Sequence, residues 1–275
     1  VLRPPNPGRA CVPPARSTPG ERAAMILEAV QPRVAVDFGG LGAQGSALVL
    51  DADSLEEILS APARPIPSDC WVQGQDTAYL LFTSGSTGAP KGVAVTAANL
   101  EAFCRGVLPW YAGQEGGVVL NQVSYSFDVS GCAVYAGLSC GMTLFCVDKQ
   151  MTREFRELFQ ALGDSGLTLW VSTPSFAELC AQSRQFDAAL LPGVRQFLFC
   201  GEVLTHTLCE ELAVRFPGAR VVNTYGPTEA TVLVTAVEVT EAMRRSERSI
   251  PIGAPIAGVQ LSLEGEEGGA GELVI

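Results

Sequence analysis

A run of hydroxyl residues, glycines and one lysine is the segment of this sequence best suited to chemistry. Residues 83–92 read Thr-Ser-Gly-Ser-Thr-Gly-Ala-Pro-Lys-Gly and directly follow the apolar run 78–82. Glycine lets backbone N–H groups approach a ligand closely, hydroxyls donate hydrogen bonds, and lysine supplies positive charge. These groups suit a polyphosphate, so we predict a phosphate loop. It is not a Walker A loop, because Lys91 follows Pro90 and precedes a glycine. A flexible polar linker is the alternative interpretation.

Three further segments carry polar residues directly after predicted strands. Residues 124–130 contain Asp128, which can pair with an ammonium group or, alternatively, cap a helix. Residues 223–229 offer a flat ring for a purine, a hydroxyl for a phosphate and an oxygen ligand for Mg²⁺, in Tyr225, Thr228 and Glu229. A Gly-Pro turn with a capping threonine explains residues 223–229 equally well. Residues 199–202 place Gly201 where backbone can approach a ligand, although a glycine at the end of a strand is usually just a turn.

The elements that must position these segments alternate along the chain. Apolar runs predict strands at residues 34–36, 47–50, 78–82, 118–120, 142–147, 167–172, 196–199 and 220–222, and helices are expected near 128–138, 152–162 and 207–216 and from residue 175. This alternation is typical of βαβ units with mostly parallel sheets, and the continuous run 78–82 favours a strand buried on both faces of such a sheet. From residue 231 onward the pattern becomes β-rich, with a hairpin turn at 265–271. The expected fold class is therefore α/β, with βαβ subdomains followed by a β-rich C-terminal section.

Composition excludes several classes of function. The 275 residues hold 18 Lys and Arg against 29 Asp and Glu, a net charge of −11. That charge argues against nucleic acid and anionic membrane as partners. One histidine and nine cysteines without a Cys-x-x-Cys pair argue against a zinc site. No run reaches the ~18 apolar residues of a membrane helix. The cysteines fit buried thiols in a reducing compartment, so we expect a cytoplasmic protein.

Taken together, the segments resemble the motifs of the adenylate-forming enzymes, the superfamily of acyl-CoA synthetases, luciferases and nonribosomal peptide synthetase adenylation domains. Residues 83–92 look like their phosphate loop, and residues 223–229 look like their adenine- and metal-binding motif. Residues 127–130 resemble the Phe-Asp-x-Ser motif of the amino-acid-activating branch. Residues 8–14 and 271–275 are similar to two further motifs of that branch, with Cys11 and Pro14 departing from its usual Tyr and Leu.

Within that branch, residues 172–178 and 198–204 look most like the ligases that load D-alanine onto a carrier protein. The resemblance implies that an amino-acid carboxylate attacks the α-phosphate of ATP. The products are an aminoacyl-AMP and pyrophosphate, and the aminoacyl group then passes to a phosphopantetheinyl carrier protein or domain. Neighbouring synthetase domains are implied as partners where the enzyme belongs to an assembly line.

The resemblance also assigns roles to residues. Lys91, Thr228 and Glu229 would be catalytic, with Thr87 and Glu229 holding Mg²⁺. The residues expected to bind ATP and its phosphates are Thr83, Ser84, Gly85, Ser86, Thr87, Gly88, Lys91, Gly201, Glu202, Asn223, Thr224, Tyr225, Gly226 and Thr228. Asp128 would pair with the substrate's α-ammonium group. The side chain of the substrate would lie in a pocket lined by Val129, Cys132, Val171, Leu198, Cys200, Thr224, Val232 and Leu233.

These pocket residues are apolar or small, and a buried charge on the substrate would need a partner among them. We therefore predict a small neutral amino acid, with alanine favoured and its handedness left open. An acyl- or aryl-acid ligase of the same superfamily remains an alternative.

The family pattern extends beyond both ends of the sequence. We expect residues 1–275 to be a partial N-terminal adenylation domain, with α/β subdomains to about residue 230 and the start of the β-rich section over 231–275. The family's C-terminal lid domain is expected to be absent from this stretch. A non-catalytic fragment that only binds nucleotide is therefore a further alternative.

Overall fold

The computed structural model describes residues 10–15, 18–37, 47–63, 65–84, 90–265 and 270–275. The chain divides into two compact units, residues 1–99 and residues 100–275. Of the segment 8–14, residues 8 and 9 lie outside the described part, and Cys11 forms backbone hydrogen bonds with Ala78 and Leu80.

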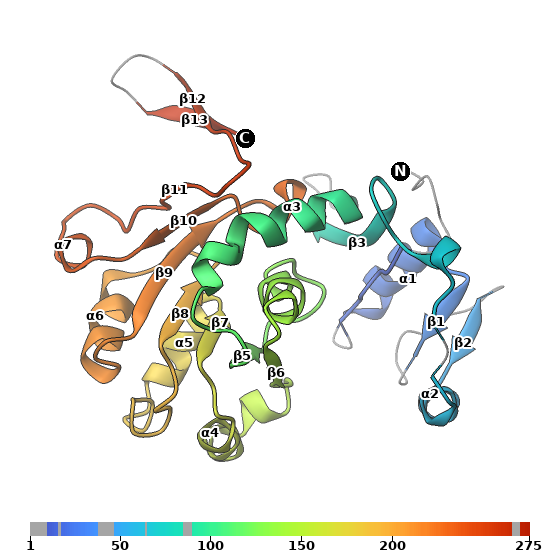
Figure 1. Cartoon of the computed structure of the whole chain (residues 1–275), viewed down its shortest axis with the longest axis horizontal. Helices are drawn as coiled ribbons and strands as arrows, with labels where there is room; N and C mark the ends of the chain where they lie inside the picture. The colour runs from blue at the N-terminus through green and yellow to red at the C-terminus, as the bar shows by residue number, and fades with distance from the viewer. Residues whose placement is uncertain (1–9, 16–17, 38–46, 64, 85–89, 266–269) are drawn as a thin grey trace. The chain divides into compact units, whose positions relative to one another are not determined.

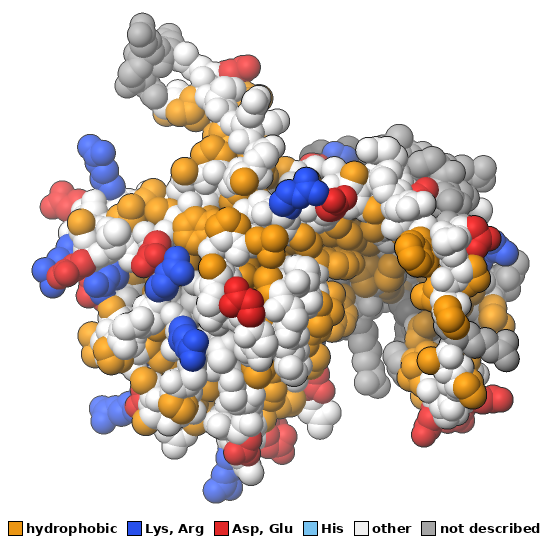
Figure 2. All heavy atoms as spheres, viewed as in Figure 1, with side chains coloured by type: hydrophobic (Ala, Val, Ile, Leu, Met, Phe, Trp, Pro, Cys, Tyr) orange, Lys and Arg blue, Asp and Glu red, His pale blue; other side chains and the backbone are white. Residues whose placement is uncertain are grey.

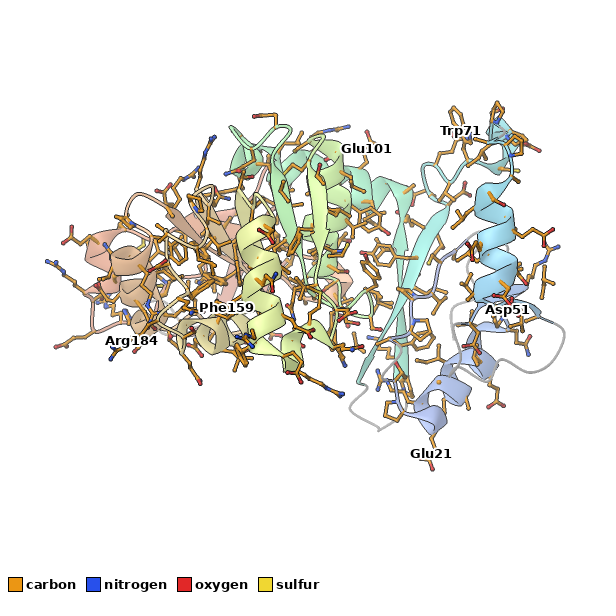
Figure 3. All side chains as sticks on the ribbon, turned by 90° about the horizontal axis from the view of Figure 1, so that it is seen from below. Glu21, Asp51, Trp71, Glu101, Phe159 and Arg184 are labelled. Carbon is orange, nitrogen blue, oxygen red and sulfur yellow. The ribbon has the colours of Figure 1, made fainter. Side chains whose placement is uncertain are left out.

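The first unit contains two pairs of strands. Strands β1 (Val34–Val36) and β2 (Leu48–Leu50) are parallel, whereas β3 (Thr77–Ser84) and β4 (Pro90–Thr96) are antiparallel. Its helices are α1 (Gly20–Val30), α2 (Ala52–Ser60) and the 3₁₀ turn η1 (Ser68–Cys70). The carboxylate of Asp51 accepts a hydrogen bond from the N–H of Ser54 at 2.9 Å and caps the start of α2 (Figure 3).

The pairing of β3 corrects one prediction. The apolar run 78–82 was expected within a parallel sheet, and it lies instead in an antiparallel hairpin with β4. Only residues 85–89 connect the two strands. A parallel pair needs a crossover of about a dozen residues or more, so this short connection permits only the antiparallel arrangement.

The second unit is built on a seven-stranded sheet with strand order β11-β10-β9-β8-β7-β5-β6 (Figure 1). Its parallel strands are β5 (Val118–Asn121), β6 (Thr143–Cys146), β7 (Leu169–Ser172), β8 (Gln196–Phe199) and β9 (Arg220–Tyr225). Strands β10 (Thr235–Glu238) and β11 (Ala254–Pro255) continue the sheet in antiparallel fashion, and β12 (Ser262–Gly265) pairs with β13 (Gly271–Val274) as a separate hairpin. The predicted mostly parallel α/β class and β-rich end are confirmed.

Helices cover both faces of this sheet (Figure 1). One face is covered by α4 (Phe155–Asp164), α5 (Pro174–Ala181) and α6 (His206–Arg215). The other is covered by α3 (Ala97–Val107), the 3₁₀ turn η2 (Leu108–Tyr111) and the π-helix η3 (Cys132–Gly137). The short elements η4 (Met151–Arg153), η5 (Thr228–Ala230) and α7 (Glu241–Arg244) complete the unit.

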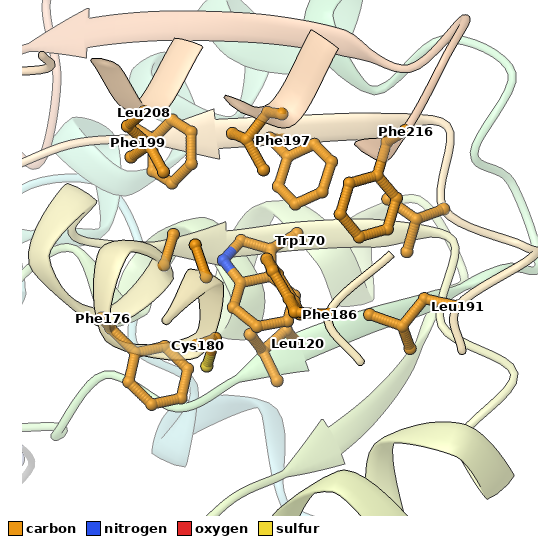
Figure 4. Packing of buried hydrophobic residues seen from close by; sticks show 14 of the residues in the cluster. Leu120, Trp170, Phe176, Cys180, Phe186, Leu191, Phe197, Phe199, Leu208 and Phe216 are labelled. Carbon is orange, nitrogen blue, oxygen red and sulfur yellow. The ribbon is translucent and has the colours of Figure 1, made fainter. Parts of the chain in front are cut away.

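The two faces of the sheet have different side chains, because successive residues of a strand point to opposite sides. We call one the aromatic face; it contains the rings of Trp170, Phe176, Phe186, Phe197, Phe199 and Phe216 (Figure 4). The other, the small-residue face, contains Val119, Val129, Cys132, Ala133, Ala136, Leu169, Val171, Leu198, Cys200, Val232 and Leu233.

Charged and apolar side chains share the surface. On the face drawn in Figure 2, acidic and basic side chains are mixed along the edge of the second unit. In the first unit, Val34, Leu48, Leu59 and Trp71 are exposed large hydrophobic residues. Within the described ranges, no helix combines the length and apolarity needed to cross a membrane.

Candidate functional site

The candidate site lies at one edge of the seven-stranded sheet. Strands β5, β7, β8 and β9 are parallel, so the loops that follow them all leave the sheet at the edge where the strands end. Those loops carry Asp128, Gly201 and Thr228. Ligands of open α/β sheets bind at this edge, and the structure therefore brings together three segments that the sequence separates by up to about a hundred residues.

Asp128 is the most unusual charged group at this edge. Its side chain is partly buried, and its Oδ2 atom is fully buried without a hydrogen-bond partner among the described residues. Burial raises the pKa of the Asp128 carboxyl above its ordinary value of 3.8, and the negative charge of Glu229 adds to this rise. Hydrogen bonds from the Thr228 hydroxyl and the Val129 N–H act in the opposite direction. An ammonium group at Oδ2 would supply the missing donor and a compensating charge.

The turn that carries Thr228 is held in an uncommon backbone conformation. Thr231 and Val232 both have positive φ, of 65° and 70°. β-branched residues rarely adopt such angles. Hydrogen bonds from the Thr231 N–H to the Thr228 carbonyl and from the Leu233 N–H to the Thr231 carbonyl fix the turn. At Gly226, a Cβ atom would lie 2.4 Å from the Leu233 Cα, so only glycine permits this close approach.

Seven of the eight predicted side-chain pocket residues lie in one buried cluster, the small-residue face. Those seven are Val129, Cys132, Val171, Leu198, Cys200, Val232 and Leu233. The eighth, Thr224, is also buried, and its hydroxyl donates to the Phe199 carbonyl at 2.8 Å. The Cys200 thiol lies 3.9 Å from the Val232 carbonyl, and burial raises the pKa of this thiol to about 11. The eight predicted pocket residues are thus uncharged, and Asp128 is the charged residue next to Val129.

The predicted nucleotide-binding residues of the second unit fall into two groups. Tyr225 and Glu229 are exposed. Asn223 and Glu202 make contacts that hold the fold: the Asn223 amide donates to the Pro251 carbonyl at 2.8 Å, and the Glu202 carboxylate accepts from the N–H and the hydroxyl of Ser175, both at 3.0 Å. Gly201, with φ of 91°, forms the turn between Cys200 and Glu202. Nucleotide contacts of these residues stay predictions.

The predicted phosphate loop belongs to the first unit. Thr83 and Lys91 face each other in register across β3 and β4, and Lys91 is exposed. Gly85, Ser86, Thr87 and Gly88 lie outside the described residues, as does the side chain of Ser84. The phosphate-binding role of this hairpin therefore stays a prediction.

A magnesium site was also predicted, at Thr87 and Glu229. Among the residues that the structure describes, no three His, Cys, Asp or Glu side chains gather into a metal-binding group. Mg²⁺ commonly uses only one or two carboxylates and takes its other ligands from substrate phosphates and water. The exposed carboxylate of Glu229, next to Thr228, fits that pattern, whereas Thr87 lies outside the described part.

Sequence reasoning missed one residue that touches the pocket wall. Tyr111 is only 1% exposed, and its hydroxyl donates a hydrogen bond of 2.7 Å to the backbone carbonyl of Cys132. Tyr111 lies in the run Leu-Pro-Trp-Tyr, which carries no motif that would mark it as functional. The π-helix that contains Cys132 has no sequence signal either, so only the structure brings the two together.

Comparison with known proteins gives consistent results. The description "AMP-binding enzyme" belongs to the family profile that matches residues 6–275. A D-alanine--D-alanyl carrier protein ligase of Bacillus licheniformis is 38% identical over 282 residues, covering 98% of this chain and 55% of its own length. The ligase of the same name from Lactiplantibacillus plantarum is 39% identical over 280 residues, covering 98% and 54%. The chain thus spans about half the length of the curated relatives it matches.

Solved structures show the same fold. The nonribosomal peptide synthetase FmoA3 matches with a TM-score of 0.80 and 26% identity, over 92% of this chain and 27% of its own. IdnL7 matches with a TM-score of 0.73 and 29% identity, over 93% and 54%. The N-terminal subdomain of Klebsiella oxytoca NpsA, solved in complex with 3-hydroxybenzoyl-AMSN, matches with a TM-score of 0.77 and 21% identity, over 96% and 67%.

Proposed function

Because the chain belongs to the AMP-binding enzyme family, we propose that it forms the amino-acid-binding part of an adenylating ligase. The reaction joins the carboxylate of a small neutral amino acid to the α-phosphate of ATP. A carboxylate oxygen forms a bond to the α-phosphorus, the bond from that phosphorus to the β-phosphate oxygen breaks, and pyrophosphate leaves. The amino acid would be alanine or one of similar size.

The observation that carries this proposal is the environment of Asp128. Its Oδ2 atom is buried, receives no hydrogen bond from the part of the chain that the structure describes, and lies beside a cluster of apolar and small side chains. An α-amino acid has an ammonium group for this oxygen and a side chain for the cluster. A carboxylic acid without an amino group would leave the oxygen unpaired, which disfavours the acyl- or aryl-acid alternative.

The remaining roles follow from the chemistry of nucleotidyl transfer, which needs positioning and charge neutralisation more than acid–base groups. The ring of Tyr225 would lie against the adenine and the Thr228 hydroxyl would hold the α-phosphate. Glu229 would hold Mg²⁺, whose charge screens the phosphate oxygens when it is bound. Thr83, Lys91 and the loop between them would hold the outer phosphates.

We further propose a carrier protein or domain as the acceptor of the aminoacyl group. The support is the similarity to relatives that are D-alanine--D-alanyl carrier protein ligases. A reducing, cytoplasmic setting is supported by the nine free cysteines.

Exchange of labelled pyrophosphate into ATP tests the proposal. The assay uses the whole natural protein that contains this chain, with a panel of amino acids. We expect the strongest exchange with D- or L-alanine and a clear loss in Asp128→Ala. Strongest exchange with Asp, Glu, Lys or Arg would overturn the substrate proposal. Full activity of Asp128→Ala on amino acids would favour the acid-ligase alternative, and ATP binding without exchange would favour a binding fragment.

A further inference from the structure

The π-helix η3 begins at a pocket residue. Cys132 is its first residue, is completely buried, and belongs with Cys200 to the small-residue face. π-helical turns are rare, and they are found frequently at functional sites. The predicted pocket residue Cys132 is thus presented by an uncommon backbone conformation.

Glycines allow close packing at both ends of the π-helix, against Val232 in the loop between β9 and β10 and against Val119 on β5. A Cβ atom at Gly131 would lie 3.1 Å from a methyl group of Val232, and one at Gly137 would lie 2.9 Å from a methyl group of Val119. The absence of side chains at these two positions lets the helix backbone approach the small-residue face. A larger residue at either position would push the helix backbone away from its neighbours.

Tyr111 contacts the same turn from the neighbouring element η2. Its hydroxyl donates to the Cys132 carbonyl at 2.7 Å in a completely buried setting. A buried carbonyl gains substantially from such a donor, because no water can replace it. The ring of Tyr111 packs on the small-residue face, so the substitution Tyr111→Phe removes the hydroxyl and keeps the ring.

We propose that Tyr111 is a positioning residue that sets the size of the amino-acid pocket by holding the π-helical turn at Cys132. The inference rests on the proposed function, since it concerns the selectivity of the same site. Without the phenol hydroxyl, the turn relaxes towards ordinary α-helical geometry. The Cys132 side chain then withdraws from its present place in the pocket wall, and larger substrates fit.

Binding of non-hydrolysable aminoacyl sulfamoyl adenosines tests this inference. Calorimetry would compare the alanyl, valyl and leucyl compounds in the wild-type chain, in Tyr111→Phe and in Tyr79→Phe. Tyr79 is a buried tyrosine of the first unit, on β3, and serves as the matched control. We expect the preference for alanyl over valyl to fall about tenfold in Tyr111→Phe, a size typical of one or two methylene groups, and to stay unchanged in the control.

Amide hydrogen exchange provides the second readout. We expect exchange of residues 132–137 to accelerate in Tyr111→Phe and to stay as in the wild type in Tyr79→Phe. A lower unfolding temperature with an unchanged alanyl preference would show a purely structural role and overturn the inference. Absence of binding by the wild-type chain would overturn the proposed function, and the inference would fall with it.

Discussion

The two faces of the seven-stranded sheet use the same strands for different purposes. In β8, Phe197 and Phe199 point to the aromatic face, whereas Leu198 and the following Cys200 lie on the small-residue face. On the aromatic face, the rings of Phe197 and Phe216 are 4.9 Å apart, and those of Trp170 and Phe186 are 5.0 Å apart. Large rings in close contact fill space and hold the fold together.

The small-residue face has features that a purely structural core avoids. It borders an aspartate oxygen for which the described residues offer no donor, two consecutive β-branched residues with positive φ, and a π-helix. Such features persist where the surroundings fix them, and they cluster at functional sites. The comparison assigns close aromatic packing to one side of the sheet, and the uncommon features of the other side support the proposal that it recognises the ligand.

Replacement of Trp170 by alanine should give the largest effect on stability. The side chain is completely buried and stacks on Phe176 at 5.6 Å. Loss of a buried tryptophan costs about 3–5 kcal/mol in the free energy of unfolding, measurable by urea denaturation. Val171→Ala, the next residue on the opposite face, should cost about 2 kcal/mol. Equal losses from the two changes would contradict the division between the faces.

Replacement of Asp128 by asparagine should separate recognition from stability. We expect binding of alanyl sulfamoyl adenosine to weaken about 100-fold, because an ammonium group loses its charged partner. Unliganded Asp128→Asn should be more stable than the wild type at neutral pH. The raised pKa of Asp128 means that the folded state disfavours its charge, so the wild type loses stability as pH rises through that pKa.

The difference in stability between Asp128→Asn and the wild type should depend on pH. Below the ordinary value of 3.8 the carboxyl is protonated in both the folded and the unfolded state, and the advantage of asparagine should vanish. Urea unfolding of both proteins at acidic and neutral pH measures this. An advantage that persists unchanged in acid would show that desolvation of the charge is not its cause.

Alkylation of the buried thiols should sharpen the comparison further. Burial raises the pKa of Cys200 to about 11, and those of Cys180 and Cys209, on the aromatic face, to about 12. At pH 8, Cys200 should hold about 100-fold less thiolate than a thiol with the ordinary pKa of 9.0, since each pKa unit is a factor of ten. Iodoacetamide labelling followed by mass spectrometry should therefore modify the exposed Cys70 and Cys146 before the buried Cys200, Cys180 and Cys209. Modification of Cys200 as fast as that of Cys70 would contradict its burial.

The smallest expected effect concerns the cap of α6. The Thr205 side chain accepts from the Leu208 N–H at 3.2 Å, and its hydroxyl donates to Glu178 at 2.7 Å. Thr205→Ala should lower the free energy of unfolding by about 1 kcal/mol, without changing the preference for the alanyl compound. Thr205→Ser is the control that retains the hydroxyl. A changed substrate preference would show that the two faces are coupled.

Much of the fold could be predicted from the sequence. The strands over 118–120, 196–199 and 220–222 were recognised because continuous apolar runs mark buried parallel strands. Helix α3 was missed, although Thr96 and Asn99 cap its start reciprocally, with the Asn99 N–H donating to the Thr96 hydroxyl at 3.1 Å and the Thr96 N–H donating to Asn99 at 3.0 Å. The usual signature has Glu or Gln where this chain has Asn99.

The candidate site was predicted less completely. Asp128 and Thr228 could be named because their types and their places after strands indicate chemistry. Their hydrogen bond and the unpaired Oδ2 atom depend on how β5 and β9 are placed in the sheet, which no local pattern specifies. Tyr111 was missed for the same reason, since its role comes from a contact with a residue 21 positions later.

Side chains of β8 point alternately to the aromatic face and to the small-residue face, and this alternation limits how the protein can evolve. An in-frame insertion of one codon within the strand would exchange its two faces, bringing an aromatic ring towards the ligand and a thiol among the rings. Point substitutions on alternate residues leave the opposite face intact. New substrate preferences should therefore arise by single-base changes, and lineages descended from this gene should keep the length of β8 constant while its pocket positions diversify.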